Sequence, residues 1–216
     1  MSEIPALDAG AVLWSVPPAE RGDAPLLVLL HGYGSHEGDL FALAELLPDE
    51  FVAAALRAPL TPPFPTPGHS WFPIEGLHGR APGGATAAAE RVLEWIDGVA
   101  PGAKVGILGF SQGGVVALQA LRLRPDTVAF VVNLAGFVDA DPLPGDEALA
   151  DRRPPVFWGR GARDEVIPGG RIAHTVEWLP AHSELSGRVY PGLAHSVSQE
   201  EIDDVVTFLR LQLDAS

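Results

Sequence analysis

The chain has 216 residues, with 14 lysines and arginines against 28 aspartates and glutamates, so its formal net charge is −14 at pH 7. Such an acidic chain is a poor partner for nucleic acid or for an anionic membrane surface, because both repel negative charge. It contains no cysteine, which excludes disulfides, thiolate metal sites and a cysteine nucleophile. We therefore expect a globular protein that has no nucleic-acid partner.

The length favours a single domain spanning residues 1–216, because no linker, repeat or charge block divides the chain. The first residues show no basic segment followed by an apolar one, as a signal peptide would. No apolar run reaches the roughly 18 residues that a membrane span requires. We expect a cytoplasmic protein without a membrane span, either a monomer or a homodimer.

Short apolar segments alternate along the chain with segments of helical period. The apolar segments have the length of strands and lack a polar face, which is typical of parallel strands that are covered on both sides. The predicted strands are 26–30, 51–56, 105–108, 128–134 and 156–158, with a weaker strand at 188–190 and an edge strand within 11–16.

Helices are predicted between and after these strands. An amphipathic helix has its apolar stripe over residues 85–96. A second helix is apolar nearly all round over residues 115–121, so we expect it to be buried. A third helix opens with a capping-box pattern at 198–201 and extends to Leu213. The alternation predicts an α/β fold with a mostly parallel central sheet and helices on both faces, and it leaves little chain for a cap domain.

The segment Gly109-Phe110-Ser111-Gln112-Gly113 matches the pattern Gly-x-Ser-x-Gly between a predicted strand and a predicted buried helix. In a nucleophile elbow, this strand–turn–helix arrangement holds a reactive serine on a strained turn. The helix that follows offers backbone N–H groups and partial positive charge to a developing oxyanion. The pattern predicts Ser111 as a nucleophile. The alternative is a glycine-rich turn with a serine that faces solvent.

A serine nucleophile needs a base and a carboxylate that orients the base. Of the seven histidines, His195 lies on a loop at the carboxyl end of the predicted sheet, where sites of α/β proteins form. The acid is expected between serine and histidine in the chain. Asp164, in the turn after the strand at 156–158, is the predicted acid, and Asp139, after the strand at 128–134, is its rival.

Two backbone N–H groups are expected to bind the oxyanion. One belongs to Gln112, the residue after the nucleophile, and the other to a loop after an earlier strand. The loop His31-Gly32-Tyr33-Gly34 follows the strand at 26–30, and its glycines allow a close approach. Tyr33 is the predicted second donor, and a plain tight turn is the alternative.

Four segments together resemble the carboxylesterase/phospholipase family of the α/β-hydrolases, which includes acyl-protein thioesterases and bacterial carboxylesterases. The resemblance implies an α/β-hydrolase fold without a cap domain, a triad of Ser111, Asp164 and His195, and an oxyanion hole of the Tyr33 and Gln112 amides. It also implies substrate contacts by Trp71 and Phe72, and by Phe137. The segments are His31-Gly32-Tyr33-Gly34, Gly109-Phe110-Ser111-Gln112-Gly113-Gly114, Asp164-Glu165-Val166-Ile167-Pro168 and Gly192-Leu193-Ala194-His195.

The predicted function is that of a serine carboxylesterase that hydrolyses small-molecule esters or thioesters with short to medium acyl chains through an acyl-enzyme. This chemistry needs no metal and no cofactor. The alternatives are a dienelactone-hydrolase-like or lysophospholipase-type hydrolase, and a non-catalytic protein of the same fold that binds a small ligand.

The segment Pro59–Pro67 contains five prolines in nine residues. Proline restricts the backbone, so this segment is expected to be stiff. With Phe64, Trp71 and Phe72 it forms either a wall that faces an acyl group or a surface connection whose aromatic side chains cover the core.

Overall fold

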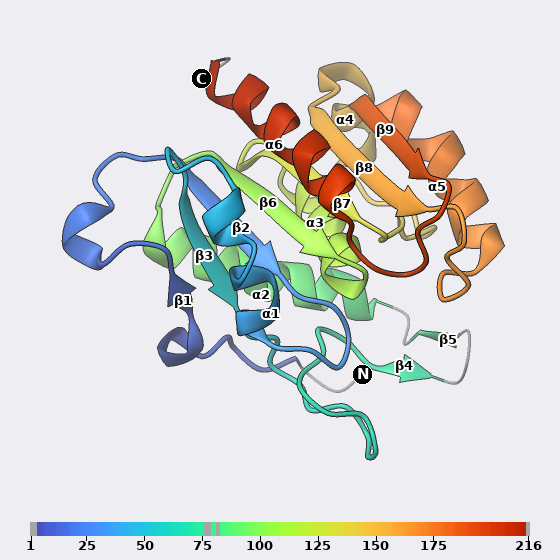
Figure 1. Cartoon of the computed structure of the whole chain (residues 1–216), viewed down its shortest axis with the longest axis horizontal. Helices are drawn as coiled ribbons and strands as arrows, with labels where there is room; N and C mark the ends of the chain where they lie inside the picture. The colour runs from blue at the N-terminus through green and yellow to red at the C-terminus, as the bar shows by residue number, and fades with distance from the viewer. Residues whose placement is uncertain (1–3, 76–78, 81–82, 215–216) are drawn as a thin grey trace.

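The structure is a computed structural model that describes residues 4–75, 79–80 and 83–214. A seven-stranded sheet in the order β1-β3-β2-β6-β7-β8-β9 crosses the centre of the molecule (Figure 1). β1 pairs antiparallel with β3, and the other pairings are parallel. The strands are β1 (Leu13–Trp14), β2 (Leu26–Leu30), β3 (Val52–Leu56), β6 (Val105–Phe110), β7 (Val128–Leu134), β8 (Pro155–Gly161) and β9 (Glu184–Tyr190), and a separate ribbon pairs β4 (Ile74–Glu75) with β5 (Gly79–Arg80).

Helices cover both faces of the sheet (Figure 1). On one face, alternate residues of β2 such as Val28 pack with the apolar sides of α2, α3 and α5. On the other face, the intervening residues such as Leu27 pack in one cluster with α1 and α6. The helices are α1 (Glu37–Phe41), α2 (Gly84–Val99), α3 (Gln112–Leu123), α4 (Asp146–Arg152), α5 (Gly169–His182) and α6 (Gln199–Asp214).

The predicted strands lack a polar face because helices bury both faces of the sheet. The structure confirms the α/β fold with a mostly parallel sheet. The helices predicted over 85–96 and 115–121 correspond to α2 and α3. No cap domain is present among the described residues. Within those same ranges, no helix is both long and apolar enough to cross a lipid bilayer.

The last strand differs from its prediction. The sequence indicated only 188–190, whereas β9 spans Glu184–Tyr190. β9 lies at the edge of the sheet, and all of its side chains except Tyr190 are partly or fully exposed. A strand with one open side requires few apolar residues, so its apolar pattern was too weak to show its full length.

The predicted capping box at the start of α6 is only half formed. Ser198 Oγ accepts a hydrogen bond from the Glu201 N–H at 3.2 Å. The Glu201 side chain turns into the interior, where neither carboxyl oxygen makes a hydrogen bond of normal geometry among the described residues. The Ser198 N–H still interacts with this carboxyl group and opposes the rise of its pKa. The reciprocal half of the box is therefore a weak contact and not a full hydrogen bond.

Candidate active site

Ser111 lies at the junction of β6 and α3 with φ 52° and ψ −114°, a backbone conformation that non-glycine residues rarely adopt. Its N–H donates to the carbonyl of Leu134 at 2.8 Å, which ties the turn to the end of β7. A Cβ atom on Gly113 would lie 2.0 Å from the Leu30 carbonyl oxygen, and one on Gly109 would lie 2.3 Å from the Gly113 backbone. Only glycine fits at these two positions, so the turn holds Ser111 in one strained geometry.

A continuous chain of hydrogen bonds runs from Ser111 to Asp164. His195 Nε2 lies 2.8 Å from Ser111 Oγ, and His195 Nδ1 lies 2.7 Å from Asp164 Oδ2. The second oxygen of Asp164 accepts from the N–H groups of Val166 and Ile167, which fixes the carboxylate. With the Nδ1 proton directed at the carboxylate, Nε2 is oriented to accept the serine proton.

The three side chains come from three loops at the carboxyl ends of parallel strands of the sheet. Ser111 follows β6, Asp164 follows β8, and His195 lies on the loop that joins β9 to α6. The Asp164 side chain is 2% exposed and that of His195 is 16% exposed, so the acid is covered while the imidazole remains accessible. The rival acid Asp139 is buried elsewhere, where its Oδ1 accepts from the Asp141 N–H at 3.2 Å.

The loop after β2 packs directly on the turn that carries Ser111. A Cβ atom on Gly32 would lie 3.0 Å from the Phe110 ring and 3.5 Å from Ser111 Cβ. Residues 32–35 form a tight turn, in which the Ser35 N–H donates to the Gly32 carbonyl and Gly34 has φ 78°. Tyr33 takes the second position of this turn. The hydrogen bond that closes the turn does not use the Tyr33 N–H. Gln112 is the first residue of α3, where N–H groups have no partner within the helix. The two predicted oxyanion donors therefore belong to backbone segments that flank Ser111.

Sequence reasoning did not identify the role of His31 beneath this loop. Its Nδ1–H donates to the Gly32 carbonyl at 2.7 Å, and its Nε2 accepts from the Ala58 N–H at 3.1 Å. Burial lowers the pKa of His31 to about 4, so the ring is neutral at pH 7, as its acceptor role requires. Its position directly after a buried strand was the only available signal in the sequence.

Trp71 and Phe72 lie behind the loop rather than on an open surface. Trp71 is fully buried, and its indole N–H donates to the His31 carbonyl at 2.8 Å. The Gln112 side chain accepts from the Trp71 N–H and donates to the Phe72 carbonyl. These bonds join the segment around Trp71 to the loop after β2 and to the first turn of α3. In this structure the indole has no free surface for a substrate.

The three aromatic residues of the proline-rich region do not form one wall. The side chain of Phe64 is 97% exposed, whereas Trp71 and Phe72 belong to the core. Of the two interpretations of Pro59–Pro67, the structure agrees with a surface connection whose neighbouring aromatics cover the core.

The loop after β7 packs against the turn that carries Ser111. Ala135 has φ 52°, a second strained non-glycine residue, and a Cβ atom on Gly136 would lie 2.9 Å from the Ser111 carbonyl oxygen. Asn133, fully buried, accepts the Gly136 N–H at 2.8 Å and thereby closes this loop. Phe137 follows and is partly exposed, so of the three predicted substrate contacts it is the one with free surface. Asn133 was not identified from the sequence.

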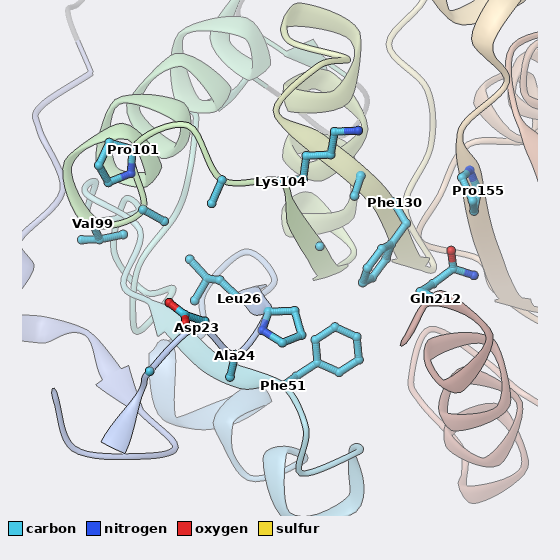
Figure 2. Close-up of a pocket in the computed structure, with 16 residues that line it drawn as sticks. Asp23, Ala24, Leu26, Phe51, Val99, Pro101, Lys104, Phe130, Pro155 and Gln212 are labelled. Atoms are coloured by element: carbon cyan, nitrogen blue, oxygen red, sulfur yellow. The ribbon is translucent and has the colours of Figure 1, made fainter. Parts of the chain in front are cut away.

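A separate groove of about 850 Å³ opens at the opposite edge of the sheet, where the strands begin (Figure 2). Its lining includes Leu26, Phe51, Lys104, Phe130 and Pro155, which Figure 2 shows around the opening. No residue of the Ser111 site lines it. This groove is therefore distinct from the candidate active site.

A mostly parallel sheet with helices on both faces and a serine on a strained turn between β6 and α3 defines an α/β-hydrolase. The order of the hydrogen-bonded residues along the chain, serine, aspartate and histidine, is that of the same fold.

Comparison with known proteins identifies the family. The sequence profile described as Phospholipase/Carboxylesterase matches residues 14–213. The chain therefore belongs to the phospholipase/carboxylesterase family of α/β-hydrolases.

Individual relatives agree with this assignment. The chain is 34% identical over 113 residues to acyl-protein thioesterase 1 of Debaryomyces hansenii, an alignment that covers 50% of this chain and 48% of that one. Its structure is similar to that of esterase PE8, with a TM-score of 0.72, 27% identity, and coverage of 87% of this chain and 92% of the other. The acyl-protein thioesterase 2 of Zea mays has the same fold, with a TM-score of 0.77, 23% identity, and coverage of 94% and 98%. The chain spans about half the length of the curated relatives it matches.

Proposed function

We propose that this protein is a serine carboxylesterase that hydrolyses carboxylic esters or thioesters with short to medium acyl chains. The observation that carries the proposal is the unbroken hydrogen-bonded chain from Ser111 Oγ through His195 to Asp164 Oδ2. Its members come from three separate loops, and the nucleophile occupies a strained backbone conformation. Strain of this kind persists where the surrounding structure enforces it, which is typical of active sites.

In the proposed reaction, Ser111 Oγ attacks the ester carbonyl while His195 Nε2 takes the hydroxyl proton. Asp164 holds the imidazole in the required tautomer and offsets the charge of the imidazolium. The tetrahedral intermediate collapses when His195 returns the proton to the leaving alcohol or thiol. Water then attacks the acyl-enzyme with His195 again as base, which releases the acid and restores Ser111.

The Tyr33 and Gln112 backbone N–H groups would bind the oxyanion of each tetrahedral intermediate. The loss of one such donor typically costs about 10²–10³ in rate. Phe137 is the proposed substrate contact with free surface. Trp71 and Phe72 hold the flanking backbone, so we assign their contribution to the position of the Tyr33 loop and of Gln112.

Labelling of Ser111 tests the proposal. A fluorophosphonate probe is expected to modify the wild-type protein and the matched control Ser186→Ala, whose serine lies on the edge strand β9. Ser111→Ala is expected to be unlabelled and to lose turnover of p-nitrophenyl acetate. Labelling that persists in Ser111→Ala would refute the assignment of the nucleophile. Absence of turnover in the wild type would favour a ligand-binding protein.

A series of p-nitrophenyl esters tests the expected acyl length. The proposal predicts that kcat/KM is highest for short or medium chains and falls for long ones. A maximum at long chains would exclude that part of the proposal while leaving the serine mechanism in place.

A further inference from the structure

Arg171 lies in the first turn of α5, directly after the loop that carries Asp164. Its guanidinium stacks over the ring of Phe137, with Cζ 4.5 Å from the ring centroid. Phe137 follows Gly136, which packs against the carbonyl of Ser111. Arg171 thus contacts the side chain of the residue that follows Gly136, at the same edge of the sheet as Ser111.

The guanidinium of Arg171 is partly buried without a counter-ion. Among the residues that the structure describes, its N–H groups have no acceptor and no carboxylate lies within 4.0 Å. Burial lowers the pKa of Arg171, and Asp141 attracts the cation only from a greater distance. A partly desolvated cation without a close partner is unfavourable. The partial burial of the Arg171 guanidinium therefore requires an explanation beyond packing.

Arg122 is an arginine with a structural role, and its hydrogen-bond partners provide a comparison for Arg171. Its side chain is 1% exposed and makes two hydrogen bonds to the Asp146 carboxylate. The carbonyls of Asp139 and Asp141 and the side-chain oxygen of Gln119 accept its remaining donors, and the guanidinium also lies over a tryptophan ring. Both arginines lie over an aromatic ring, but the part of the chain that the structure describes supplies acceptors only to the in-plane donors of Arg122.

We propose that Arg171 is a specificity residue that binds a free carboxylate of the substrate, so that the preferred esters are anionic. This inference rests on the proposed esterase function. Stacking on Phe137 uses one face of the guanidinium and leaves the N–H groups in its plane, where they match the two oxygens of a carboxylate. Because the whole chain carries a net charge of −14, a local cation is needed for an anionic ester to bind beside Ser111.

The test compares pairs of substrates that differ only in charge. For a carboxylate in the acyl part, monoethyl succinate is compared with its neutral isostere ethyl 4-methylpentanoate. For a carboxylate in the alcohol part, acetoxyacetate is compared with isobutyl acetate. In at least one pair the wild type is expected to prefer the anion, and Arg171→Gln is expected to reduce that ratio of kcat/KM values about tenfold. Arg171→Lys keeps the charge without the planar fork and is expected to retain part of the preference.

Arg210→Gln removes the same charge from an exposed position on α6 and serves as the matched control. If Arg171→Gln leaves both ratios within about twofold of wild type, or if Arg210→Gln lowers them equally, the inference is overturned. Salt provides a second readout, because screening should reduce the preference of the wild type and not the ratio in Arg171→Gln.

Binding to Ser111→Ala separates this inference from the proposed function. In an NMR titration, the anionic ester that the wild type prefers is expected to bind Ser111→Ala about tenfold more tightly than the double variant Ser111→Ala/Arg171→Gln. If the wild type turns over neither ester, no preference is known, and monoethyl succinate and acetoxyacetate are both titrated. Serine-dependent turnover without this difference would overturn the role of Arg171 alone. A difference in binding without turnover in the wild type would overturn the esterase function and leave carboxylate binding in place.

Discussion

His31 illustrates how one buried side chain supports the loop after β2. Its two ring nitrogens bind different backbone segments, the Gly32 carbonyl and the Ala58 N–H. Both bonds form together only when the ring is neutral, with its proton on Nδ1. Protonation would place a hydrogen on Nε2, directly against the Ala58 N–H, which is itself a donor. The geometry of the Tyr33 loop therefore depends on a neutral His31.

This dependence predicts how stability varies with pH. The pKa of His31 is lowered in the folded state from its usual 6.5 to about 4, so the unfolded chain binds a proton first as the pH falls. The wild type is expected to lose on the order of 2–3 kcal/mol relative to His31→Gln between pH 6.5 and pH 4. Urea unfolding of both proteins across this range measures the difference. A constant difference would contradict a buried neutral His31.

The choice between two acids can also be tested at single residues. Asp164→Asn is expected to lower kcat by about 10³–10⁴, because the amide no longer holds the imidazole in the required tautomer. Asp139→Asn removes a carboxylate that does not contact His195 and is expected to retain most of kcat. Steady-state kinetics on p-nitrophenyl acetate distinguish the two. A comparable loss in both variants would contradict the assignment of Asp164.

At the scale of elements, β7 and the turn that carries Ser111 stabilise each other. The two strained residues Ser111 and Ala135 lie on either side of the hydrogen bond from the Ser111 N–H to the Leu134 carbonyl. Asn133 adds a side-chain bond that holds Gly136 against Ser111. The strain of the elbow is thus balanced by a second loop rather than by α3 alone.

Removal of the Asn133 acceptor is therefore expected to weaken both elements. Asn133→Ala leaves the buried Gly136 N–H without a partner, which typically costs about 1–3 kcal/mol. We expect a lower free energy of unfolding in urea and a fall in kcat that exceeds any change in KM, because Ser111 loses support. An unchanged kcat in a destabilised variant would show that the loop after β7 does not position the nucleophile.

The contact of α6 with the sheet contains an unpaired acid. Glu201 is 1% exposed, its carboxyl group packs on Gly159 of β8, and burial with the nearby Asp204 raises its pKa to about 7. Between pH 4.5 and pH 7 the unfolded chain releases this proton more readily, so the free energy of unfolding falls as the pH rises. The protonated acid is the form that the interior accommodates.

Glu201→Gln mimics the protonated form and is expected to abolish the fall in the free energy of unfolding that the wild type shows as the pH rises. Relative to wild type, the variant should gain stability as the pH rises from 5 to 8, by on the order of 2–3 kcal/mol. Thermal unfolding of both proteins at each pH measures the gain, and Glu200→Gln on the exposed side of the same helix turn is the matched control. A gain that does not grow with pH would contradict the raised pKa.

At the scale of the whole molecule, the strand order brings the site together. β6 lies between β2 and β7, and β8 and β9 follow, so the loops after these strands meet along one edge (Figure 1). Ser111 and Asp164 lie 84 and 31 residues before His195 in the chain, yet the three side chains are joined by hydrogen bonds. Parallel strands produce this convergence because all their carboxyl ends point the same way.

The net charge of −14 acts on the molecule as a whole. Repulsion among excess carboxylates destabilises the compact state, and salt screens it. The melting temperature at pH 8 is expected to rise when sodium chloride is increased from 0.02 M to 0.2 M. Scanning calorimetry measures the shift. A fall would indicate that screened surface ion pairs such as Arg124–Asp97 outweigh the repulsion.

Much of the fold could be predicted because strands that are buried on both faces appear in the sequence as continuous apolar runs. The runs at 26–30 and 128–134 agree with β2 and β7 to the residue. The edge strand β9 and the short helices α1 and α4 were missed in whole or in part, since exposed or brief elements need few apolar residues.

The sequence by itself determined the order and type of the main elements, the glycines of the strained turn and the family motifs. These depend on local sterics and on periodic burial, which neighbouring residues encode. Only the tertiary structure decided that Trp71 is buried behind the Tyr33 loop, that Glu201 faces the core and that no carboxylate of the described residues lies within 4.0 Å of Arg171. Partners and burial of single side chains depend on contacts between residues distant in the chain, and local patterns do not contain that information.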